Sequence, residues 1–242
     1  MFLTKIDNID GVDSDLMVKY DALNLNPFSV HQKIIGCVGK QKKILDVGCA
    51  VGVLAKEMKN NDCEVVGIEL DDKSADIAQE HCVELVRGNV ESIELEDNYS
   101  NYFDFIIFAD VLEHLRDPSN VLKRFVKYLK DDGYIIVSLP NIANWRIRLK
   151  LLSGNFNYES HGILDESHLR FFTEKTAKDL ITNSKLEISK FDITVGDVNK
   201  FSRMFNFMGG IWPTFFAYQF LIVAKKGNNC YNAIKLEQQT KE

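Results

Sequence analysis

The chain has 242 residues, of which 45% are hydrophobic, and 29 Lys+Arg against 35 Asp+Glu give a formal net charge of −6. This composition is typical of a soluble globular domain; it excludes a disordered or collagen-like chain and disfavours a nucleic-acid binder, which usually has a strongly basic surface. The five cysteines form no C-x-x-C pair, so we expect reduced thiols in a cytoplasmic protein and no cysteine zinc site.

Neither end of the sequence predicts membrane insertion. The N-terminal residues turn acidic before an apolar run forms, so no secretory signal is expected. The stretch from Phe205 to Ala224 is uncharged for 20 residues. It contains two glycines, a proline and polar amides, which would interrupt a spanning helix, so we expect no transmembrane span.

Short apolar runs alternate with helical spacing along the chain, which indicates βαβ units around a parallel sheet. The predicted strands are Lys43–Val47, Glu64–Ile68, Val83–Val86, Phe103–Ala109, Tyr134–Leu139, Leu186–Val195 and Tyr218–Lys225. The predicted helices are Val53–Asn60, Lys73–His81, Ser119–Leu129 and one that begins at Thr173. We expect a single domain with an N-terminal helical segment (1–40), a cofactor-binding half (41–139), a substrate lid (140–175), closing strands (176–227) and a flexible tail (228–242).

The first predicted strand runs into a glycine turn and then a helix, K-I-L-D-V-G-C-A-V-G-V-L-A over 43–55. Gly48 and Gly52 allow backbone N–H groups to approach a ligand at the start of the helix. The nicotinamide fingerprint G-x-G-x-x-G is not met, because Ala50 and Val53 stand where it needs glycines. The pattern favours a cofactor loop over a plain tight turn, and disfavours a pyrophosphate cradle.

Polar side chains follow the next three strands. Glu69 ends the second strand, where a carboxylate can accept both hydroxyls of a ribose. Asn89 and Asp110 follow the third and fourth strands and should meet Glu69 at the same carboxyl edge of the sheet. Asn and Asp at strand ends are also common helix caps, and each acidic residue taken alone is weak evidence, so the prediction rests on their order and spacing.

With these motifs the sequence resembles the class I S-adenosylmethionine-dependent methyltransferases. The resemblance implies an α/β, doubly wound, Rossmann-like sheet of seven strands, mostly parallel with an antiparallel last strand, and S-adenosylmethionine as cofactor. It also implies a cofactor-binding set: Asp46, Gly48, Cys49, Ala50 and Gly52 around the methionine part, Glu69 and Leu70 at the ribose, Asn89 and Val90 at the adenine, and Asp110 and Val111. An aromatic residue, Tyr20, is expected to close over the cofactor. Ala50 and Asn89 depart from the usual Gly and Asp, so we expect weaker cofactor binding.

The segment Pro140–Thr173 resembles a subset of these enzymes from bacterial surface-glycan and related secondary pathways, and forms a helical lid before the sixth strand. Within it Trp145, Leu149 and Leu152 fall on one helical stripe, whereas Arg146, Arg148 and Lys150 face away. The basic face is interpreted as simply solvated, as binding a phosphate or uronate, or as touching an anionic membrane surface. We assign Arg146, Arg148 and Arg170 to substrate binding.

Histidine is the favoured general base, because its ordinary pKa lies close to working pH. His114 lies one helical turn after Asp110 and is our first candidate, although a structural role is as reasonable. His168 is the second, with a role in tying the lid to the sheet as its alternative, and His161 is the weakest. No Asp-Asn pair accompanies Asp110, so no metal is expected.

The leading hypothesis is methyl transfer to a hydroxyl, or an amine, of a small-molecule or glycan-precursor acceptor. A non-catalytic S-adenosylmethionine-binding sensor or scaffold is the alternative. Asp110 is followed by V-L-E and not by the N-P-P-aromatic run that holds a flipped base, so no nucleic-acid substrate is expected. We expect a monomer or homodimer in the cytoplasm, without a transmembrane span, and leave peripheral membrane contact open.

Overall fold

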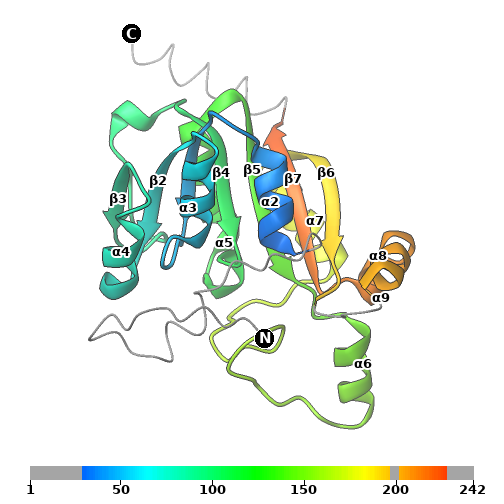
Figure 1. Cartoon of the computed structure of the whole chain (residues 1–242). Helices are drawn as coiled ribbons and strands as arrows, with labels where there is room; N and C mark the ends of the chain where they lie inside the picture. Colours follow the sequence, from blue (N-terminus) through cyan, green and yellow to red (C-terminus); the bar gives the residue numbers. More distant parts are fainter. Residues whose placement is uncertain (1–28, 197–201, 228–242) are drawn as a thin grey trace, which may run out of the picture.

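The structure, a computed structural model, describes residues 29–196 and 202–227. Its centre is a seven-stranded sheet in the order β3-β2-β1-β4-β5-β7-β6 (Figure 1). The strands are β1 (Lys43–Val47), β2 (Glu64–Glu69), β3 (Glu84–Arg87), β4 (Phe103–Ala109), β5 (Leu129–Pro140), β6 (Leu186–Thr194) and β7 (Gln219–Lys226). The first five are paired in parallel, and β7 runs antiparallel to both β5 and β6. The predicted fold class is confirmed.

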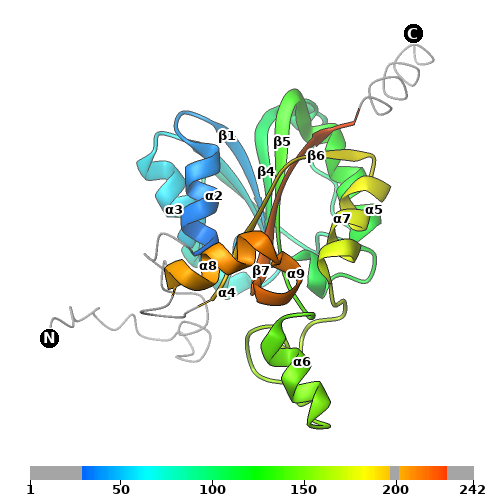
Figure 2. The ribbon, with the colours of Figure 1, turned by 90° about the vertical axis from the view of Figure 1, so that its right-hand side faces the viewer.

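Helices cover both faces of the sheet (Figure 2). The helices are α2 (Val30–Val38), α3 (Val53–Asn60), α4 (Asp72–Ala78), α5 (Pro118–Phe125), α6 (Trp145–Leu152), α7 (Glu174–Asn183), α8 (Ser202–Ile211) and α9 (Pro213–Phe216). Short 3-10 turns form at Asp97–Tyr99 (η1), Leu112–His114 (η2) and Val126–Tyr128 (η3). Apolar side chains of α2 and α3 pack on one face, and those of α5 and α7 pack on the other. Burial on both faces explains why the central strands are nearly continuous apolar runs.

Most predicted boundaries agree with the observed ones within a few residues. The largest difference is β5, which begins at Leu129 and not at Tyr134. Its first residues include Lys130, Asp131 and Asp132, and polar residues of this kind hide a strand from a hydrophobic pattern. The same shift shortens the preceding helix, which ends at Phe125 and continues as the η3 turn.

The insertion between β5 and α7 contains α6, which projects away from the sheet beyond the carboxyl ends of the parallel strands (Figures 1 and 2). The predicted apolar stripe is wrong: Leu149 and Leu152 are 55% and 84% exposed, and Ile147 is the buried residue of the helix. The reason is local packing, because Ile147 joins a small cluster with Ile163 and Leu164 of the same insertion. Across the parts of the chain that are described, every helix is too short or too polar to cross a bilayer.

Candidate active site

A cavity of about 650 Å³ lies at the carboxyl ends of the parallel strands. Most of the residues predicted to bind the cofactor line it: Asp46, Gly48, Cys49, Ala50, Glu69, Leu70, Asn89, Val90, Asp110 and Val111. The predicted His114 also lines it, together with His31, Leu115 and Ser167. Gly52 shapes the loop without lining the cavity, and Tyr20 lies outside the described residues. The topology of the sheet therefore brings strand ends from distant parts of the sequence to one place.

The loop after β1 needs both of its glycines. Gly48 has φ +68°, and a Cβ there would lie 2.7 Å from Val111 Cγ2. Gly52 has φ +80°, and its Cβ would lie 2.9 Å from the Cα of Ala78. Between them Ala50 also takes a left-handed conformation, with φ +48°. The loop is thus built as a glycine turn, and Ala50 carries a methyl group in a conformation that L-residues disfavour.

Glu69 ties this loop to the end of β2. Its Oε2 accepts from the Ala50 N–H at 2.8 Å, and its Oε1 accepts from the N–H groups of Leu70 and Asp71, also at 2.8 Å. The carboxylate is fixed by three backbone donors, which fill both acceptor positions of Oε1 and leave one acceptor position free on Oε2. Asn89 uses its Oδ1 in a similar way, accepting from the Glu91 N–H at 2.8 Å.

Asp46 is the unsatisfied acceptor of the site. The residue is only 3% exposed, and among the described residues its Oδ2 has no hydrogen-bond partner. Burial, and secondly the nearby Glu69 carboxylate, raise the pKa of Asp46 to about 7. A buried carboxylate of this kind requires a donor or a cation. The ammonium, sulfonium and hydroxyl groups of S-adenosylmethionine supply both, so the lining fits that cofactor.

Asp110 is held rigidly at the end of β4. Gln219 Nε2 donates to both of its carboxylate oxygens at 2.8 Å, and Ser138 Oγ donates to Oδ1 at 2.6 Å. The Asp110 N–H donates back to the Ser138 hydroxyl, and its φ is +55°. Strand β5 and the reversed strand β7 therefore both help to aim this side chain, and strained backbone of this kind clusters at functional sites.

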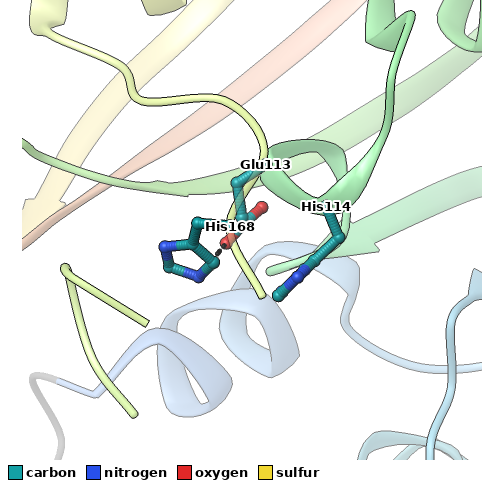
Figure 3. Close-up of side chains that lie close together, drawn as sticks. All are labelled: Glu113, His114 and His168. Carbon is teal, nitrogen blue, oxygen red and sulfur yellow. Dashed lines mark ion pairs between the residues drawn. The ribbon is translucent and has the colours of Figure 1, made fainter. Parts of the chain in front are cut away.

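The two predicted catalytic histidines take different places (Figure 3). His114 lines the cavity, and its Nδ1 lies 3.2 Å from the carbonyl oxygen of Ser167. His168 is 9% exposed and is absent from the cavity lining; its Nδ1 lies 3.2 Å from the Ile163 carbonyl oxygen. The rings pack edge to face at 4.8 Å, and burial lowers the pKa of His168. This placement favours a supporting role for His168, behind His114.

Glu113 lies beside these two histidines. Its side chain is 1% exposed, and neither carboxyl oxygen has a hydrogen-bond partner among the described residues. Burial, and then the Asp110 charge, raise the pKa of Glu113 well above its ordinary value. Ligand atoms of Glu113, His114 and His168 all lie within 4.8 Å of one another, an arrangement that could hold a metal ion.

His31 is a site residue that the sequence did not indicate. It comes from the first turn of α2 and lines the cavity, with its Nδ1 buried and unpartnered among the described residues. Burial lowers the pKa of His31, opposed by the Asp110 charge, so the ring is neutral at pH 7. No motif surrounds His31, and only the packing of α2 against the sheet brings it to the site.

The three arginines assigned to substrate binding do not line the cavity. Arg146 and Arg148 are exposed on α6, where the Arg148 Nε donates to the Ala143 carbonyl. Arg170 donates to the Arg116 carbonyl, and the N–H groups of Leu169 and Arg170 both donate to the Glu113 carbonyl at 2.9 Å. The structure thus favours the alternative role for this segment, in which it ties the lid to η2. Of the lid, Ser167 alone lines the cavity.

The site and the fold agree with the comparisons to known proteins. Residues 29–189 match the family model described as a methyltransferase domain, so the chain belongs to that family. It is an S-adenosylmethionine-dependent methyltransferase. A ubiquinone biosynthesis O-methyltransferase of Shewanella pealeana is 28% identical over 173 residues, which cover 67% of this chain and 71% of that protein.

Solved structures share the fold. An S-adenosylmethionine-dependent methyltransferase of Methanosarcina mazei aligns with a TM-score of 0.61 and 20% identity, over 85% of this chain and 99% of that one. A possible histamine N-methyltransferase of Thermotoga maritima aligns with a TM-score of 0.60 and 19% identity, over 82% and 88%. At such identities the likeness shows the fold and leaves the acceptor undefined.

The finer resemblance to surface-glycan enzymes is not confirmed. Three similar curated proteins are ubiquinone biosynthesis O-methyltransferases, and this chain matches 71%, 43% and 60% of their length. The matched family model ends at residue 189, before β7, α8 and α9.

Proposed function

We propose that the protein transfers the methyl group of S-adenosylmethionine to a hydroxyl group of a small-molecule acceptor. The observation that carries this proposal is the placing of His31 and His114 in the same cavity as Asp46, Glu69 and Asp110. A hydroxyl acceptor must lose a proton as it is methylated, and a histidine facing the cavity can take it. The relatives named as O-methyltransferases support an oxygen acceptor.

In this proposal the strand ends would hold the cofactor, and the histidines line the same cavity. Asp46 and the loop after β1 hold the methionine part, Glu69 the ribose, and Asn89 with Val90 the adenine. When bound, S-adenosylmethionine supplies an activated methyl group on a sulfonium. The chain then aligns the acceptor in line with that group and excludes water, which is the main way a protein lowers the barrier of a displacement reaction.

His114 is our choice for the general base. The Ser167 carbonyl oxygen can only accept a hydrogen bond, so the His114 Nδ1 must donate to it. In the neutral ring this leaves the lone pair on Nε2. Nε2 can therefore accept the proton that the hydroxyl loses when it is methylated. His31 is the second candidate, because its neutral ring lines the same cavity.

The test is a methyl-transfer assay by mass spectrometry, with phenolic, nucleotide-sugar and lipid-linked glycan acceptors. We expect one acceptor class to gain one methyl group while S-adenosylhomocysteine accumulates. His114→Ala should lower turnover about 10²–10⁴-fold and leave cofactor binding intact. His161→Ala, an exposed histidine outside the cavity, is the matched control.

Three outcomes would count against parts of the proposal. A larger loss of turnover in His31→Ala than in His114→Ala would assign the general base to His31 of α2. Methylation of an amine and of no hydroxyl would overturn the oxygen acceptor. Cofactor binding with no transfer to any acceptor class would favour the sensor or scaffold alternative.

A further inference from the structure

Glu113 is placed where a carboxylate is costly. It is 1% exposed, and among the described residues neither oxygen has a hydrogen-bond partner. Burying an unpaired carboxylate costs several kcal/mol unless a cation or hydrogen-bond donors compensate for the lost water. The nearest basic atom is His168 Nε2, at 4.0 Å from Oε1, which is too long for a hydrogen bond. Among the described residues, the chain itself therefore offers this carboxyl group no hydrogen-bond donor.

The two histidines beside it are both turned so that Nε2 is available. Each lies with Nδ1 at 3.2 Å from a backbone carbonyl oxygen, Ser167 for His114 and Ile163 for His168. A carbonyl oxygen only accepts, so both Nδ1 atoms donate and both neutral rings carry their lone pair on Nε2. Imidazole rings that ligate metals are oriented in this manner, through a hydrogen bond from the other ring nitrogen.

We propose that Glu113, His114 and His168 form a binding site for a divalent transition-metal ion. The ligand atoms lie within 4.8 Å of one another and converge from η2 and the lid segment (Figure 3). Two imidazole nitrogens and one carboxylate suit zinc, or iron(II) and its neighbours, more than magnesium or calcium. Three protein ligands leave at least one coordination position open, as in catalytic sites.

The site lies at the edge of the cavity, because His114 is both a lining residue and a ligand. If the proposed function holds, an ion there would compete with the role of His114 as base and would bind the acceptor oxygen in its place. The sequence predicted no metal because no Asp-Asn pair accompanies Asp110. His168 is far from Glu113 and His114 along the chain, and only the fold brings the three side chains together. The metal proposal itself requires no methyl transfer.

The experiment is a titration of the full chain, freed of metal by chelation, with Zn²⁺ alone in a calorimeter and with Co²⁺ in a spectrophotometer. We expect one equivalent of each ion to bind. Glu113→Gln and His168→Gln should each weaken binding at least about tenfold, and His161→Ala should not change it. Denaturation midpoints and heats of S-adenosylmethionine binding show whether each variant is folded.

Co²⁺ also reports the ligand type. Absorption of a nitrogen- and oxygen-bound ion is expected, whereas a thiolate charge-transfer band would place the ion on a cysteine and overturn the site. Absence of binding to the folded wild type, or equal binding by wild type, Glu113→Gln and His168→Gln, would also overturn it. If Glu113→Gln does not fold, the His168→Gln titration decides. A wild-type protein that binds the metal but methylates no acceptor would refute the proposed function and leave the metal site standing.

Discussion

Ala50 occupies a backbone conformation that normally belongs to glycine. Its φ of +48° lies in the left-handed region, between Gly48 and Gly52, which are also left-handed. An L-residue there is less favourable than glycine by about 1–2 kcal/mol. The Ala50 N–H nevertheless donates to Glu69, and the strained residue lines the cavity. That hydrogen bond and the packing around the loop keep Ala50 in its left-handed conformation.

We therefore predict that Ala50→Gly stabilises the protein by up to about 1 kcal/mol, since relief of the left-handed strain exceeds the extra entropy that glycine gives the unfolded chain. Urea denaturation measures this change. Ala55→Gly, in the buried interior of α3, is the matched control and should destabilise by about 1 kcal/mol or more. Equal destabilisation by both substitutions would contradict the strain at Ala50.

The contribution of Asp46 to the stability of the protein depends on pH. The pKa of Asp46 is about 7 in the folded chain against the ordinary 3.8, so the unfolded chain loses this proton at a lower pH than the folded chain. The contribution of Asp46 to stability is complete below about pH 4, falls as the pH rises to about 7, and is then constant. Wild type should lose up to about 4 kcal/mol relative to Asp46→Asn across this window. Denaturation of both proteins from pH 4 to 8 tests this, and a constant difference would refute it.

At the scale of elements, the unit β1–loop–α3 defines the site and was also the most predictable part. Both β1 and α3 have their predicted boundaries, because apolar periodicity, glycine spacing and strand length all agree there. His31 and the pairing of Glu113 with His168 could not be predicted. Their significance comes from burial and from contacts between distant segments, which leave no local pattern. The exposure of Leu149 and Leu152 was hidden for the same reason.

This unit yields a third prediction. Gly52→Ala should destabilise the protein by at least about 1–2 kcal/mol and abolish cofactor binding, because the new methyl group would lie 2.9 Å from the Cα of Ala78 at a left-handed position. Gly36→Ala is the matched control: it lies within α2 and has open space around its Cα, so it should stabilise by about 1 kcal/mol. Thermal denaturation and calorimetry compare the two. A Gly52→Ala variant with wild-type stability and affinity would contradict the loop geometry.

At the scale of the whole molecule, the reversed pairing of β7 with β5 and β6 is what completes the site. It places Gln219 against Asp110, although the two residues are far apart in sequence. The parallel strands bring the residues predicted to bind the cofactor to one edge, and helices pack on both faces of the sheet. The arrangement of the cavity therefore depends on the sheet topology.

Calorimetry of the full chain with S-adenosylmethionine and S-adenosylhomocysteine tests the account most directly. We predict that both bind with one-to-one stoichiometry, that Glu69→Ala abolishes the heat, and that Glu64→Ala, an exposed glutamate at the other end of β2, does not. The heat should vanish in Glu69→Ala because the loop amides and the ribose lose their shared acceptor. A folded wild-type protein that gives no heat with either compound would contradict the conclusion that the cavity binds S-adenosylmethionine.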